Sequence, residues 1–308
     1  MIKIKTISVL DLILSGCGGG GGGGSSSNNS DGVVPTVAFT SWGAVRPNTR
    51  VVAPGISSEA TYTENSSGGV SSVGDYTNYY GVEFTETLDS NGQISKATIT
   101  TGDGDRLVFD KSDGATFTPL VGGAATVAIN KDFTELAIAT DPATQGWNYQ
   151  TFGVWQRYPS STDTGRIGAI STGAFTDANR IPTTSSAIFT GSAAGVYQFS
   201  SLTSYLASAD MALNVNFANR TASFATSNTY ISNDGGASSS PYSSIDLSGS
   251  MTLIPNQNNM YGAVTSRNGM TGIMHARFYG PNAEEVGGTF GVSGSGVQTF
   301  VGGFGGTR

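Results

Sequence analysis

The chain has 308 residues, of which 44 are glycine and 12% are charged, and its formal net charge is −7. This composition favours many short strands and turns over long exposed helices. The acidic balance, with no cluster of lysine or arginine, argues against binding to nucleic acid or anionic lipid through charge. A single cysteine excludes an intramolecular disulfide and a multi-cysteine metal site.

Residues 1–17 have the pattern of a bacterial lipoprotein signal peptide. Two lysines precede a short apolar segment, which Asp11 interrupts. The segment ends in Leu14-Ser15-Gly16-Cys17, which resembles a lipobox, where small residues precede a lipidated cysteine. We therefore predict lipidation of Cys17, for example with palmitate, and keep a free cysteine in an unstructured N-terminus as the alternative.

Residues 18–32 are glycine- and serine-rich and predict a disordered tether. A tether of this length has a typical end-to-end distance of roughly 20 Å. No uninterrupted apolar stretch is long enough for a transmembrane helix. The expected attachment to a membrane is therefore through the N-terminal lipid only.

Residues 33–145 contain a first set of predicted strands. Asn91-Gly92 predicts a hairpin turn, because this pair suits the positive φ angles of a type I′ turn. Asp141-Pro142 marks a plausible domain boundary. The predicted strands cover residues 36–42, 59–64, 79–88, 93–101, 106–110 and 133–140.

Residues 146–308 contain strands separated by turns every ten to fifteen residues or so, the spacing of an up-and-down barrel or sandwich. One short helical piece is predicted at residues 202–206. The predicted strands cover residues 147–156, 165–175, 187–199, 211–217, 221–228, 245–253, 260–265, 270–279, 286–292 and 297–302.

One stretch near the C-terminus has a distinctive order of residues. In the strand that it begins with, Met274, Ala276 and Phe278 share one parity and are predicted to face the core, so His275 and Arg277 face the other way. Gly280-Pro281 then ends the strand, because proline cannot donate to a ladder.

The thirteen residues from Phe278 to Phe290, with Gly280-Pro281, Glu284-Glu285 and Gly287-Gly288, resemble the closing motif of the β-barrel domain of transferrin-binding protein B-like surface lipoproteins. Residues 149–155 and 190–197 also resemble segments of this family. The resemblance implies an all-β fold with an N-terminal handle-like antiparallel sheet at residues 33–145 and an eight-stranded antiparallel β-barrel at residues 146–308.

The resemblance also implies a non-enzymatic function. Members are lipid-anchored outer-membrane proteins, and we expect this chain to capture an iron source of the transferrin, haemoglobin or haem class at the cell surface. The iron source would pass to a TonB-dependent outer-membrane receptor. The alternative is a surface lipoprotein without an iron role, such as an adhesin, a binder of complement regulators or a structural coat protein.

Few residues suggest chemistry. His275 is the only histidine, so a catalytic triad or a two-histidine metal site is not expected, and no metal site or resident cofactor is predicted. His275 is interpreted as a structural barrel residue or, alternatively, as a candidate haem ligand. Glu284 and Glu285 are expected to accept hydrogen bonds from backbone amides or to pair with Arg277. Asp103-Gly104-Asp105 is interpreted as a hairpin turn rather than a calcium loop.

Aromatic residues in predicted loops of the first half are the candidate partner-binding residues. They are Trp42, Tyr76, Tyr79 and Tyr80. Tyrosine and tryptophan at exposed positions are frequent anchors of protein interfaces. In a small β domain such residues also form the core, and that alternative stays open here.

Overall fold

The computed structural model describes residues 34–159, 164–233 and 238–308. The predicted lipidation site at Cys17 and the tether at residues 18–32 lie outside the described residues. No helix within the described ranges is long and apolar enough to cross a membrane.

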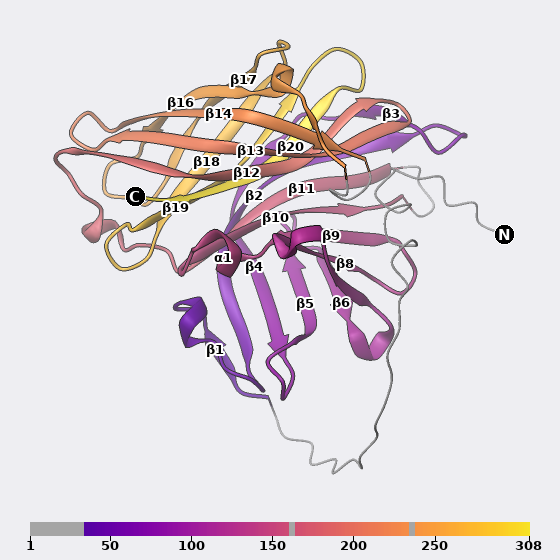
Figure 1. Ribbon diagram of the computed structural model, residues 1–308, viewed down its shortest axis with the longest axis horizontal. Coiled ribbons are helices and arrows are strands. Elements are labelled where there is room, and N and C mark those ends of the chain that lie inside the picture. Colours follow the sequence, from indigo (N-terminus) through magenta and orange to yellow (C-terminus); the bar gives the residue numbers. More distant parts are fainter. Residues whose placement is uncertain (1–33, 160–163, 234–237) are drawn as a thin grey trace.

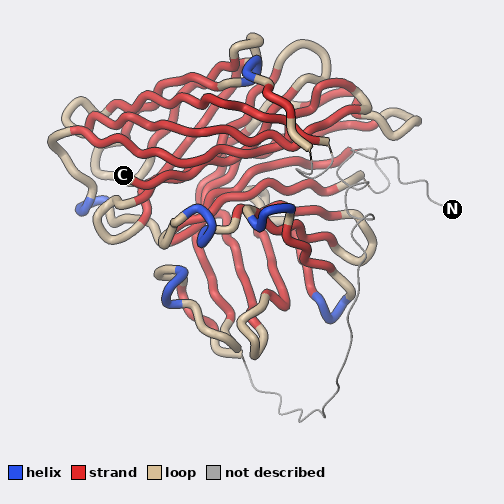
Figure 2. Tube along the Cα trace, in the orientation of Figure 1, coloured by secondary structure: helices blue, strands red, loops and turns tan. Residues whose placement is uncertain are grey.

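The described chain is all-β, as predicted, with short helical turns between strands (Figure 2). In the first half the strands are β1 (Thr36–Ala38), β2 (Arg50–Glu64), β3 (Val70–Val73), β4 (Thr77–Leu88), β5 (Ile94–Thr100), β6 (Arg106–Asp110), β7 (Thr116–Pro119), β8 (Ala125–Ile129), β9 (Glu135–Thr140), β10 (Gln150–Arg157) and β11 (Thr164–Gly173). In the second half they are β12 (Ser186–Ser200), β13 (Thr203–Asn216), β14 (Thr221–Ser232), β15 (Ser240–Pro241), β16 (Leu247–Leu253), β17 (Met260–Ser266), β18 (Thr271–Tyr279), β19 (Glu285–Ser293) and β20 (Thr299–Thr307). The helical turns are η1 (Trp42–Ala44), η2 (Lys111–Asp113), η3 (Val121–Gly123), α1 (Pro142–Gln145), η4 (Ala178–Arg180) and η5 (Ser243–Ile245).

Strands β1 to β11 form one sheet, which we call the handle. Its main order is β6-β5-β4-β2-β11-β10-β9-β8-β7, with β1 and β3 also paired to β2. All pairs are antiparallel except β1 with β2. The sheet curls until it is nearly closed, since Val108 N on β6 donates to Glu135 Oε2 on β9 at 3.1 Å. Arg157 on β10 reaches the same edge and donates to the carbonyl oxygen of Arg106 at 2.6 Å.

Strands β12 to β20 form the second sheet, which we call the barrel. Eight strands follow one another in the order β13-β12-β20-β19-β18-β17-β16-β14, and pairing of β13 with β14 closes the ring. The predicted eight-stranded antiparallel barrel is therefore confirmed. Met274, Ala276 and Phe278 point into its core, as their parity predicts. The interior is filled by the chain's own side chains, including Phe224 and Phe304 with ring centroids 4.6 Å apart.

The change from one sheet to the other falls between Gly173 and Ser186. Strands β10 and β11 follow the predicted boundary at residue 145, yet they pair with β9 and β2 in the handle. The domain limits themselves stay a prediction. The predicted helical piece at residues 202–206 is wrong, because β13 starts at Thr203 and Leu206 pairs with Val196. Cross-strand pairing outweighs local helix propensity there.

Glycines on the outer face of the barrel allow the handle to lie directly on the barrel backbone (Figure 1). Strands β2, β10 and β11 of the handle contact β19 and β20 of the barrel. A Cβ atom on Gly303 would lie 2.6 Å from Cδ2 of the buried Phe152, and one on Gly287 would lie 2.7 Å from Gln150 Oε1. Any larger residue at these positions would hold the two sheets apart.

We expect Gly303→Ala to lower the free energy of unfolding by about 1–3 kcal/mol, because the new methyl group overpacks against Phe152. Gly43→Ala is the control, since its Cβ would meet its nearest atom at 3.6 Å. Urea unfolding of both variants measures the effect. Equal stability of the two variants would contradict close packing of the handle on the barrel.

Candidate functional site

The predicted motif forms the contact between the two sheets, which we call the junction. Glu285 accepts hydrogen bonds from the backbone amides of Asn148 at 2.6 Å and Tyr149 at 3.0 Å, just before β10. Burial raises the pKa of Glu285, while these backbone donors act to lower it. Glu284 accepts from the backbone amide of Asn282 at 2.8 Å. Within the described chain neither carboxylate pairs with Arg277. The prediction that these glutamates accept hydrogen bonds from backbone amides is therefore confirmed.

His275 lies on the outward face of β18 and is fully buried under the handle. Its ring centroid is 5.2 Å from that of Tyr80. Burial, together with the nearby charge of Arg277, lowers the pKa of His275 to about 3, so the imidazole is neutral at physiological pH. The haem-ligand interpretation stays a prediction. It requires the imidazole to be uncovered first, because no part of His275 is exposed.

Arg277, two residues further on, is held by aromatic rings. Its guanidinium carbon lies 4.3 Å from the ring centroid of Phe175 and 5.5 Å from that of Tyr80. Burial lowers the pKa of Arg277 from its ordinary value. No acidic side chain pairs with it among the residues that the structure describes.

Tyr80 contacts this cation, and a second exposed tyrosine, Tyr261, lies near Tyr80. Tyr80 is 46% exposed, and Tyr261, which lies opposite His275 in the β17–β18 ladder, is 51% exposed. We call Tyr80, Arg277 and Tyr261 the junction patch. Tyrosine and arginine are the residue types that most often anchor protein interfaces.

The predicted partner-binding residues have different environments. Trp42 donates its indole N–H to the carbonyl oxygen of Gln150 at 3.1 Å, and the Tyr76 hydroxyl lies 2.7 Å from Thr299 Oγ1 on the barrel. Tyr79 packs on Gly102 within the handle. Of the four, Tyr80 is the one with a largely exposed side chain. Their role in partner binding stays a prediction.

The turn predicted at Asp103-Gly104-Asp105 joins β5 to β6, and its two carboxylates form ion pairs with arginines. Asp105 accepts from Arg157 at 2.6 Å, and Asp103 accepts from Arg166. Arg166 also bonds the buried Glu59 at 2.6 Å. These ion pairs hold the turn against β10 and β11, as a structural interpretation requires. The described residues contain no cluster of three or more metal-ligating side chains.

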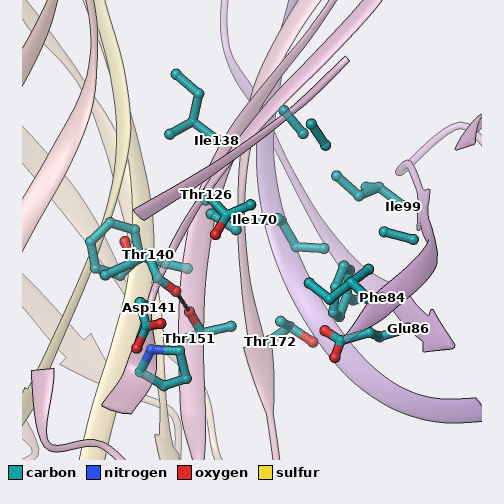
Figure 3. Close-up of a pocket in the computed structure, with 18 of the residues that line it drawn as sticks. Phe84, Glu86, Ile99, Thr126, Ile138, Thr140, Asp141, Thr151, Ile170 and Thr172 are labelled. Atoms are coloured by element: carbon teal, nitrogen blue, oxygen red, sulfur yellow. Dashed lines mark hydrogen bonds between the residues drawn. The ribbon is translucent and has the colours of Figure 1, made fainter. Parts of the chain in front are cut away.

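The handle contains a cavity of about 300 Å³, partly open to solvent, that sequence reasoning missed (Figure 3). Its walls come mainly from β4, β5, β8, β9 and β10, and they are apolar over most of their area. Five aromatic side chains contribute to the lining, namely Trp42, Phe84, Phe109, Phe117 and Phe152. The lining contains two carboxylates, Glu86 and Asp141. Asp141 caps α1 by accepting from the backbone amide of Thr144 at 2.9 Å.

Glu86 is a carboxylate without a hydrogen-bond donor among the described residues. Burial alone raises its pKa to about 7. Two hydroxyl groups of the lining are committed elsewhere, since Thr172 donates to the carbonyl oxygen of Pro54 at 2.9 Å and Thr151 to that of Thr140 at 2.7 Å. The sequence does contain a signal for Glu86, because it shares its parity with the core residues Val82 and Leu88.

Comparisons with known proteins agree with the geometry of the barrel. Residues 181–308 match the family described as C-lobe and N-lobe beta barrels of Tf-binding protein B. The motif from Phe278 to Phe290 lies inside the matched residues, so the match confirms the resemblance that it indicates. No curated protein matches the sequence significantly.

Several solved structures are similar in fold at low identity. Transferrin binding protein B of Haemophilus parasuis, in a mutant form, is 13% identical, with 82% of this chain and 44% of that one covered and a TM-score of 0.45. Isotype 1 transferrin binding protein B of Neisseria meningitidis is 16% identical, with 82% and 43% covered and a TM-score of 0.42. The N-lobe of lactoferrin binding protein B of Moraxella bovis is 10% identical, with 82% and 98% covered and a TM-score of 0.39. The chain thus spans less than half the length of the two transferrin binding proteins.

We expect Glu285→Gln to lower the free energy of unfolding by about 2 kcal/mol, because the buried glutamine side chain would present only one acceptor to the backbone amides of Asn148 and Tyr149. Glu284→Gln is the matched control, and its effect should stay below about 1 kcal/mol because its bonds are at the surface. Urea unfolding measures both changes. If the two variants lost equal stability, Glu285 would not hold the handle to the barrel.

Proposed function

The chain has a transferrin-binding protein B-like fold, and from this premise we propose that it is a non-enzymatic, lipid-anchored outer-membrane protein that captures an iron source. The iron source is a carrier protein of the transferrin or haemoglobin class, or haem. It is handed to a TonB-dependent outer-membrane receptor. The anchor is the lipid on Cys17, and the folded part is displayed at the cell surface by the tether at residues 18–32.

The family match of residues 181–308 is the observation that carries this proposal, because that family is named for transferrin binding. The filled interior of the barrel supports it too. A barrel whose inward side chains pack against one another has no room for a ligand inside, so binding must use outer surfaces. In this proposal the barrel is a rigid scaffold for surface residues and does not hold the ligand in its interior.

The junction patch is our candidate for part of the partner-binding surface. Arg277 is fixed between two rings and lacks an acidic partner among the described side chains, so a partner carboxylate can pair with it at little cost in side-chain entropy. The exposed rings of Tyr80 and Tyr261 add apolar area beside this charge. A second candidate function, a surface lipoprotein without an iron role, would use the same patch for another protein.

We expect the mature protein to capture transferrin, haemoglobin or haem in a pull-down, and Tyr80→Ala combined with Tyr261→Ala to weaken protein capture at least about tenfold. Tyr230→Ala is the control, because Tyr230 is also exposed, at 43%, but lies on β14. Surface plasmon resonance with immobilised protein measures the affinities.

Two outcomes would contradict the proposal. Absence of binding to every iron source, with capture of an adhesion ligand or a complement regulator instead, would favour the second candidate function. Survival of the protein during protease treatment of intact cells would contradict display at the surface.

A further inference from the structure

The cavity of the handle has the features of a small-molecule site, whatever protein the outer surfaces bind. Its volume of about 300 Å³ is at the lower end of the range of cavities that hold small ligands. It lies between strands of the handle (Figure 3), and none of the junction-patch residues lines it. Thr126, Ile138 and Ile170 form part of the wall from β8, β9 and β11.

The charge of the cavity is negative. Glu86 is the lining carboxylate whose oxygens are not engaged by the described residues, whereas Asp141 is engaged at the start of α1. A half-buried carboxylate without a donor from the described residues is unfavourable, and a cation placed beside it recovers much of that cost. The lining itself supplies no cation.

The aromatic lining favours the same class of ligand. Faces of tryptophan and phenylalanine attract cations through their quadrupoles, most strongly where water is excluded. This lining holds one tryptophan and four phenylalanines. The ammonium nitrogen of Lys111 already lies 5.7 Å from the centroid of the Phe117 ring, so one of these rings is accessible to a cation.

We propose that the handle cavity binds a small organic ammonium ion with an apolar body, whose charge is held by the carboxylate of Glu86 and whose body packs against the aromatic lining. Hydrophobic contact with the walls supplies affinity, and the carboxylate selects for positive charge. An anion of the same shape is rejected by Glu86, and a neutral molecule gains the apolar contacts alone.

Binding depends on the ionisation of Glu86. The residues opposite Glu86 in the ladder, Val51 and Ala97, are uncharged, while Arg50 and Lys96 pair with Thr87 and face the other side of the sheet. The remaining charged groups at the cavity are Asp141 in the lining and Lys111 at its outer edge. Since burial raises the pKa of Glu86 to about 7, protonation removes the charge as the pH falls below neutrality. The affinity for an ammonium ion should fall by about tenfold from pH 8 to pH 6.

The test uses three probes with one apolar body, namely hexylammonium, hexan-1-ol and hexanoate, titrated calorimetrically into the mature protein at pH 8. Hexylammonium should bind at least about tenfold more tightly than hexanol, and hexanoate should bind least. Glu86→Gln should reduce hexylammonium affinity to that of hexanol. Glu83→Gln, an exposed glutamate on the same strand, is the matched control and should change nothing.

A second variant locates the site independently of charge. Ala128→Val narrows the cavity and should weaken all three probes, provided that thermal unfolding shows the variant to be folded. Equal affinity for the three probes, no binding of hexylammonium, or equal effects of the two glutamate variants would overturn the proposal. Unchanged hexylammonium binding in folded Ala128→Val would also overturn it. None of these results bears on capture of an iron carrier.

Discussion

The structure depends on a bare strip of barrel backbone. Gly287 and Gly303 present almost no side chain on the outer face of β19 and β20, so Gln150 and Phe152 of the handle rest directly on the barrel. Glu285 adds to this contact by accepting hydrogen bonds from the backbone amides of Asn148 and Tyr149, just before β10. The two glycines allow the handle to approach the barrel closely, and the charged acceptor of Glu285 fixes the position of β10 on the barrel. The two sheets therefore behave as one body.

The residues that stand out in the sequence have structural roles. His275 is the only histidine, yet burial against the handle keeps it neutral. The Glu284-Glu285 pair holds a corner, and Asp103 and Asp105 serve arginines of β10 and β11. What remains for binding includes two charged side chains that have no oppositely charged partner among the described residues, Arg277 at the junction and Glu86 in the handle cavity.

Much of the barrel could be predicted from sequence, because inward and outward residues alternate along β18 and the motif is contiguous. The handle was harder. Strand β2 was predicted only over residues 59–64, but in the structure it runs from Arg50 to Glu64, with a register shift against β4 after Gly55. The contact between the handle and the outer face of β19 and β20 could not be predicted, because a glycine in the sequence does not indicate which residue packs against it. Glu86 carried a signal, a carboxylate at a core-facing position, that was overlooked.

Two coupled sheets unfold together. Tryptophan fluorescence reports on the handle, because all three tryptophans, Trp42, Trp147 and Trp155, lie in that half of the chain. The most direct test is urea unfolding followed by tryptophan fluorescence and, at each urea concentration, by hydrogen exchange of the barrel strands β16 to β18. Coupled sheets predict one shared midpoint for both signals. Loss of the fluorescence signal at a lower urea concentration, with the barrel amides still protected, would contradict the account.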